Sequence, residues 1–175
     1  MIPLAQLQVW QEELQGLSQD LSKLPINLRD DVAIELQKSN EALSHAHQTS
    51  HRSGFKKYFR RATYSRHAID ALRYGYIETN PWGIIQRTNT ATALLFNFPC
   101  HWLTGQPFLV FIDQPERLAF LSAVTQLRYG KIRRQEFLIT MRAVSLSKYL
   151  AHVAGERKED ADNTVFGIAW QCWPA

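Results

Sequence analysis

The amino-acid sequence predicts an α+β fold in which helices precede one antiparallel sheet of five strands and cover one of its faces. Three observations lead to this prediction. A leucine-rich helical pattern opens the chain, two strand patterns flank a turn at 80–83, and three further strand patterns occupy 136–173. Because two strands come first and three come last, with short helices between them, the simplest arrangement is a single sheet.

The composition is that of an ordinary globular protein. The chain has 175 residues, of which 45% are apolar and 21% are charged, so it can bury a sizeable core. We expect a helical segment over 1–73 and a compact domain over 74–175. No apolar run reaches the length of a membrane span, and the N-terminus lacks the pattern of a secretory signal. Two cysteines make no disulfide framework, so we expect a cytoplasmic protein.

The first helical pattern is a seam of apolar residues spaced three or four positions apart. Its members are Leu7, Trp10, Leu14, Leu17, Leu21 and Leu24. Pro25 interrupts the pattern, and a weaker one follows. Such a narrow seam must pack on a second surface to be stable. We predict that it forms the coiled-coil-like interface of a homodimer, and the alternative is a helical hairpin folded back over the domain.

Charge is distributed unevenly along the chain. Residues 1–48 hold three Lys/Arg and seven Asp/Glu, whereas residues 49–74 hold seven and one. We expect a helix over 55–73 that packs on the sheet and keeps its basic side chains in water. The alternative is a docking site for an acidic partner, an anion or a nucleic acid. This basic collar would consist of Arg52, Lys56, Lys57, Arg60, Arg61 and Arg66.

The turn Asn80-Pro81-Trp82-Gly83 separates the first two predicted strands, 76–79 and 84–88. The asparagine side chain can accept from the N–H groups of the turn, proline presets φ, and glycine ends the turn. Asn89 or Thr90 then offers an N-terminal cap to a short helix that reaches Phe96.

The middle of the domain is predicted to alternate between short helices and a buried run. One or two helical turns lie between Pro99 and Gly105, and a buried extended segment covers 108–112. Asp113-Gln114-Pro115-Glu116 has the pattern of a capping box for a helix that ends at Gly130. Strands at 136–143, 149–153 and 165–173 complete the sheet, with a charged loop over 155–163.

Taken together, these motifs resemble the PAS family. Residues 76–91 resemble the family's opening strands and first helix, and Leu103-Thr104-Gly105-Gln106-Pro107 resembles its L-x-G-x-P segment. Asp113-Gln114-Pro115-Glu116 resembles the start of its long helix. The resemblance extends over residues 74–173 in order, and the leucine-rich helices resemble the signalling helices that precede such domains. It implies a PAS-like sheet with short helices on one face.

The resemblance implies a non-catalytic regulatory module in a signalling pathway. Such a module senses a ligand or binds a partner protein, and this one is expected to dimerise through its N-terminal helices. No cofactor is predicted. The family's flavin photochemistry needs a cysteine that is absent after Gly105, and its haem versions use a histidine that 115–129 lacks. A nucleic-acid-binding or anion-binding protein that uses the basic collar is the alternative function.

Candidate sites are few. Cys100 and His101 are neighbours on a predicted helix and point apart, so we predict no catalytic residue. His45, His47 and His51 include an i,i+4 pair but have no cysteine or carboxylate beside them, so we predict no metal. One set of apolar residues could line a ligand pocket between sheet and helices, although core filling is the preferred interpretation. These residues are Ile77, Ile85, Leu95, Trp102, Phe111, Phe120, Met141 and Trp170.

Overall fold

The computed structural model describes residues 4–48, 68–130, 132–143 and 147–175, and within them it has the predicted α+β fold. The strands are β1 (Gly75–Thr79), β2 (Ile85–Thr88), β3 (Arg134–Arg142), β4 (Lys148–Glu159) and β5 (Val165–Pro174). They form one antiparallel sheet in the order β2-β1-β5-β4-β3. Ile77 pairs with Thr88 on one side and with Trp170 on the other, so the first and last strands are neighbours.

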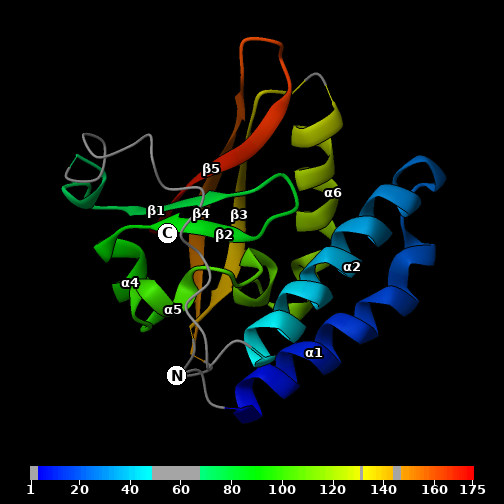
Figure 1. Cartoon of the computed structure of the whole chain (residues 1–175), viewed down its shortest axis with the longest axis horizontal. Coiled ribbons are helices and arrows are strands. Elements are labelled where there is room, and N and C mark those ends of the chain that lie inside the picture. The colour runs from blue at the N-terminus through cyan, green and yellow to red at the C-terminus, as the bar shows by residue number, and fades with distance from the viewer. Residues whose placement is uncertain (1–3, 49–67, 131, 144–146) are drawn as a thin grey trace.

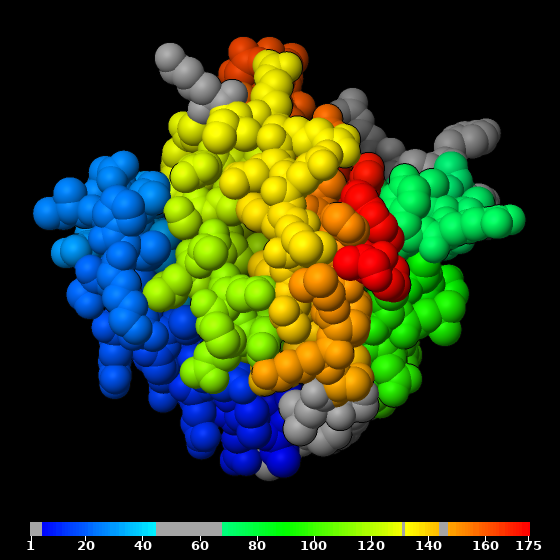
Figure 2. Space-filling view, turned by 180° about the vertical axis from the view of Figure 1, so that it is seen from behind, coloured from blue at the N-terminus to red at the C-terminus, as the bar shows by residue number. Residues whose placement is uncertain are grey.

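Short helices lie on one side of this sheet (Figure 1). They are α4 (Thr90–Phe96), α5 (Cys100–Leu103), the 3-10 helices η2 (Phe108–Phe111) and η3 (Gln114–Glu116), and α6 (Arg117–Tyr129). From behind, strands β3, β4 and β5 face the viewer in yellow, orange and red (Figure 2). The predicted arrangement of helices on one face is therefore confirmed.

The β1–β2 turn forms as its sequence predicts. The Oδ1 atom of Asn80 accepts from the N–H groups of Trp82 and Ile84, each at 3.0 Å. Gly83 has a φ of 76°, a left-handed conformation that glycine adopts without strain. Asn89 is the N-cap of α4, and its side chain accepts from the N–H of Thr92 at 3.0 Å. Local side-chain chemistry thus explains this part of the fold.

The predicted capping box before α6 does not form. The side chain of Asp113 pairs with Lys148 at 2.9 Å, and Glu116 accepts from the N–H of Thr140 at 2.6 Å. Both carboxylates therefore bind strands that are distant in sequence and do not bind the nearby helix start. Their role is to hold the edge of the sheet against the beginning of α6.

Two segments differ in type from their predictions. Residues 108–111 form the 3-10 helix η2 and are not extended. Strand β4 continues to Glu159, through the first half of the predicted charged loop. Its charged end is stabilised by side-chain pairs, because Arg157 contacts Glu159 at 2.6 Å and Lys158 contacts Glu78 at 2.7 Å.

The N-terminal segment is a hairpin of two helices. It consists of α1 (Leu4–Gln19), the 3-10 turn η1 (Asp20–Lys23) and α2 (Ile26–Gln48). Arg29 stabilises the turn at Pro25, because its guanidinium group donates to the carbonyl groups of Leu24 and Ser22 at 2.9 and 2.8 Å. In Figure 1 α2 lies between α1 and α6, and in Figure 2 the blue hairpin lies against the domain. In the part of the chain that is described, no helix is both long and apolar enough to cross a membrane.

The apolar seam of α1 is used within one chain. Leu7, Trp10, Leu14 and Leu17 are at most 5% exposed, and Leu21 and Leu24 are partly buried. The structure therefore has the hairpin alternative, and pairing of the seam between two copies stays a prediction. Because these side chains are already covered within one chain, a dimer through the same seam requires the hairpin to leave.

Aromatic side chains dominate the core between sheet and helices. Phe96 and Phe111 stack with ring centroids 4.5 Å apart, and Phe108 meets Trp170 at 5.4 Å. Trp10 of α1 packs edge-on against Phe111 at 5.6 Å. The hairpin thus continues the core of the domain.

Candidate functional site

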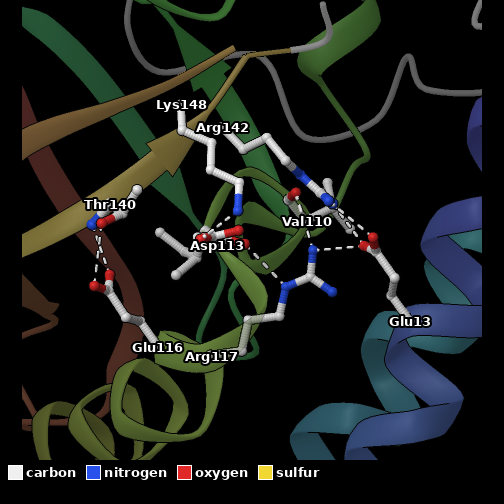
Figure 3. Close-up of polar contacts among 9 residues, drawn as sticks. Glu13, Val110, Asp113, Glu116, Arg117, Thr140, Arg142 and Lys148 are labelled. Atoms are coloured by element: carbon white, nitrogen blue, oxygen red, sulfur yellow. Dashed lines mark hydrogen bonds and ion pairs between the residues drawn. The ribbon is translucent and has the colours of Figure 1, made fainter. Parts of the chain in front are cut away.

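The main polar contact between hairpin and domain is a cluster of one carboxylate and two guanidinium groups (Figure 3). Glu13 of α1 contacts Arg117 at the start of α6 at 2.8 Å. It also receives two hydrogen bonds from Arg142 at the end of β3, at 2.8 and 2.6 Å. We call these three residues the latch. One side chain of the hairpin thus binds two separate elements of the domain.

Arg117 is the most deeply buried member of the latch. Its side chain is fully buried, and its Nε atom donates to the carbonyl group of Ile112 at 3.0 Å. Its Nη2 atom donates to the carbonyl group of Val110 at 3.4 Å as well as to Glu13. A buried charge needs a partner of opposite charge. Docking of the hairpin over Arg117 therefore requires the carboxylate of Glu13.

The electrostatics of the latch favour an ionised Glu13. Burial by itself raises the pKa of Glu13, but the hydrogen bonds and charges of Arg142 and Arg117 outweigh burial and hold the pKa below its usual value. Burial lowers the pKa of Arg117, and Glu13 opposes that shift. The carboxylate is therefore charged whenever the hairpin is docked at neutral pH.

A second contact joins α2 to α6. Glu35 is fully buried, and the Nη1 atom of Arg128 lies 3.6 Å from its Oε1 atom. The same guanidinium group stands over the ring of Trp82 in the β1–β2 turn, 5.0 Å from its centroid. Arg128 therefore touches both the hairpin and the turn of the sheet.

Most of the predicted ligand-pocket residues are buried side chains of the core. Six of them are at most 2% exposed, namely Ile77, Ile85, Phe111, Phe120, Met141 and Trp170. Their aromatic rings pack against one another and against the rings of Phe96 and Phe108. Leu95 and Trp102 are only partly buried at the edge of this cluster. Six of the eight residues are thus packed as core, and a ligand pocket among them stays a prediction.

Other predicted residues are separate from the latch or lie outside the described chain. The basic collar Arg52, Lys56, Lys57, Arg60, Arg61 and Arg66 falls within 49–67, which the structure does not describe. The structure likewise does not describe most of the predicted helix at 55–73 or the side chains of His45, His47 and His51. Cys100 donates from its Sγ atom to the carbonyl group of Asn89 at 3.2 Å, whereas His101 lies against Trp102. These two neighbours face different partners, so they make no joint site.

Comparison with solved structures identifies the fold. A PAS domain from Colwellia psychrerythraea superposes with a TM-score of 0.58 at 13% identity, over 62% of this chain and 92% of that one. The domain has the PAS fold. A PAS domain of a two-component sensor histidine kinase gives a TM-score of 0.53 at 14% identity, over 63% of this chain and 93% of that one. No protein-family model and no curated protein sequence matches this chain.

A third solved structure shows how widely the PAS fold is shared. The PAS-B domain of the Drosophila melanogaster protein Cycle, with bound ethylene glycol, gives a TM-score of 0.53 at 9% identity. The match covers 58% of this chain and 99% of that one. At such low identity the likeness establishes the fold alone. The function of this domain must be argued from its own residues.

The polar residues that join the hairpin to the PAS domain were absent from our sequence-based sites. In the sequence these residues look like ordinary charged surface residues. They are Glu13, Glu35, Arg117, Arg128 and Arg142. One available signal was position, because Glu13 directly precedes Leu14 and Glu35 directly precedes Leu36, beside the apolar seam of each helix. A charge at such a position faces whatever the seam packs against.

Proposed function

We propose that this chain is a non-catalytic regulatory module of the PAS type whose output element is the α1–α2 hairpin. The observation that carries the proposal is the latch, in which Glu13 of the hairpin forms ion pairs with both Arg117 and Arg142 of the domain. In this proposal the hairpin has two states, docked on the domain and released from it. A partner or ligand that prefers one state shifts the balance between them.

We propose that the signal comes from a partner protein in a signalling pathway. The packed aromatic core supports this choice over a small molecule held inside the domain. The shared fold with the PAS domain of a sensor histidine kinase supports a place in signal transduction. A partner acting at the hairpin competes with one buried ion cluster and needs no access to the core.

The released state also gives the predicted homodimer a physical basis. Release exposes the seam that includes Trp10, Leu14 and Leu17, which the docked hairpin buries. An exposed apolar stripe of this length favours pairing with a second copy. In this proposal, docking and dimerisation through the N-terminal helices exclude each other.

Replacing Glu13 with glutamine is expected to release the hairpin while the sheet stays folded. Gln removes the charge that balances two buried arginines, at a cost of about 3 kcal/mol. Such a cost lowers the docking constant about 100-fold. Hydrogen exchange measured by mass spectrometry should therefore speed up in α1 and α2, with β1 and β5 unchanged.

The matched control is Glu12→Gln, because Glu12 is the exposed neighbour of Glu13 on the same helix. It removes the same charge and should leave exchange unchanged. Equal loss of protection in hairpin and sheet would mean that the hairpin is an inseparable part of the core, and the output role would be rejected. Unchanged exchange in Glu13→Gln would reject the latch.

The mass in solution tests the link between release and dimerisation. We expect Glu13→Gln to form more dimer than the unmodified chain at equal concentration, by light scattering. Adding Leu14→Asp should restore the monomer, because an aspartate in the exposed seam opposes apolar pairing. A released hairpin that remains monomeric would show that this seam is not a dimer interface.

A further inference from the structure

The second contact of the hairpin contains a carboxyl group in an unusual setting. Glu35 lies between Val32 and Leu36 on the buried face of α2 and is 0% exposed. Among the described residues, no donor lies within hydrogen-bonding distance of either of its carboxyl oxygens. The Nη1 atom of Arg128, at 3.6 Å, is beyond hydrogen-bonding distance. This interface therefore encloses an acid without the partners that an ionised carboxylate requires.

Arg128 is held away from Glu35 by other contacts. Its guanidinium group lies 5.0 Å from the centroid of the Trp82 ring and 4.4 Å from that of Tyr129. Cation–π contacts of this kind stabilise the charge where it stands. Arg128 thus divides its contacts between Glu35 and the two rings.

The surroundings of Glu35 favour its neutral form. In the part of the chain that the structure describes, the charges that act on it are Arg128 on α6 and Asp31 on its own helix. Thr125 of α6 is the neutral polar neighbour. Burial raises the pKa of Glu35 to about 8, Asp31 adds to this effect, and Arg128 and Thr125 oppose it. The docked hairpin thus holds a proton on Glu35 at neutral pH.

We propose that Glu35 makes docking of the hairpin sensitive to pH, so that α2 separates from α6 as the solution becomes more alkaline. The inference rests on the proposed function, in which the hairpin docks and releases. In the released state Glu35 reaches water and has an ordinary pKa. The docked state therefore binds a proton that the released state gives up, and a rise in pH favours release.

The direction and the size of the effect follow from this linkage. The contribution of Glu35 to docking is complete below its ordinary pKa of 4.5 and is lost as pH rises towards about 8, above which Glu35 adds no further change. Between pH 6 and pH 8 the docking constant should fall about 50-fold. Glu13 acts in the opposite direction, because its lowered pKa adds stability above its ordinary value that is lost in acid.

Hydrogen exchange of the full chain at pH 6, 7 and 8 tests the proposal, with each rate divided by the intrinsic rate at that pH. Protection of α2 amides should fall about 50-fold across this range in the unmodified protein. Glu35→Gln carries a permanently neutral side chain of the same shape and should show a flat profile. The exposed Glu41→Gln on the same helix should keep the slope.

A flat profile in the unmodified protein, or an equal slope in Glu35→Gln, would overturn the proposal. The proposed function is judged separately, because Glu13→Gln releases the hairpin at constant pH. A measurement without any variant completes the test. The carboxyl carbon of Glu35, followed by NMR, should titrate near pH 8, and a midpoint at the ordinary value of a glutamate would contradict the inference.

Discussion

Replacement of Trp170 with alanine is expected to destabilise the PAS domain by about 3–5 kcal/mol. Trp170 is fully buried at the centre of β5 and contacts the rings of Phe108 and Phe120 at 5.4 and 5.1 Å. Its Nε1 atom donates to the Oγ1 atom of Thr79 at 3.1 Å. Gly155 on β4 completes the fit, because a Cβ there would overlap the indole ring. Alanine would lose these contacts and leave a cavity.

Urea unfolding followed by circular dichroism measures this loss. The control is Trp173→Ala on the same strand, since Trp173 is only half-buried and its main ring contact is with His152 at 5.8 Å. We expect the control to cost about 1 kcal/mol. A loss below 1.5 kcal/mol for Trp170→Ala would mean that the aromatic cluster is not the tightly packed core described above.

The sheet could be predicted because its determinants are local. The strand at 165–173 alternates apolar and polar residues, and Asn80 and Gly83 specify the turn that joins the first two strands. Asn89 could be recognised as a cap from its place before a short apolar helix. Such signals act over a few residues and do not depend on the rest of the chain.

The latch could not be predicted, because its members are far apart in sequence. Glu13 and Arg142 are 129 positions apart, and their contact depends on how the hairpin packs on the domain. The same limit explains the error at the capping box, where Glu116 had a plausible local partner but binds Thr140 of β3 instead. A local pattern cannot reveal a stronger partner from a distant segment.

The sequence left the choice between dimer and hairpin open for a related physical reason. Leu14 and Leu17 define a seam that must be covered, but a seam does not specify its cover. In the structure Trp10 packs on Phe111 of the domain, so the seam is covered within one chain. The position of Glu13, one turn after Trp10, then places its carboxylate at the two arginines. Seam and latch thus both hold the hairpin on the domain.

A second large effect is expected where the chain enters the domain, at Asn89. Its side chain is fully buried and makes hydrogen bonds in two directions. The Oδ1 atom accepts from the N–H of Tyr76 at 2.9 Å and also caps α4. The Nδ2 atom donates to the carbonyl groups of Ile69 and Tyr74 at 3.1 and 2.9 Å. One amide thus joins the lead-in at 69–74 to both β1 and α4.

Asn89→Asp is expected to destabilise the domain by about 3–5 kcal/mol. Aspartate keeps the shape and the capping oxygen, but it replaces the NH₂ donor with a second acceptor that faces two carbonyl groups. Those two carbonyl groups then lose their donor, and the second carboxylate oxygen is buried against them without a donor of its own. Urea unfolding gives the free energy, and hydrogen exchange should show the largest increase at 69–76.

The exposed Asn163→Asp is the matched control, because it makes the same chemical change in a turn where aspartate tolerates the positive φ of 59°. Its cost should stay below about 0.5 kcal/mol. Similar small values for both variants would show that the capping oxygen alone matters at Asn89. A large loss of stability confined to Asn89→Asp would instead show that the NH₂ group of Asn89 anchors the lead-in at 69–74. A hairpin released by Glu13→Gln would then remain attached to the sheet at this point.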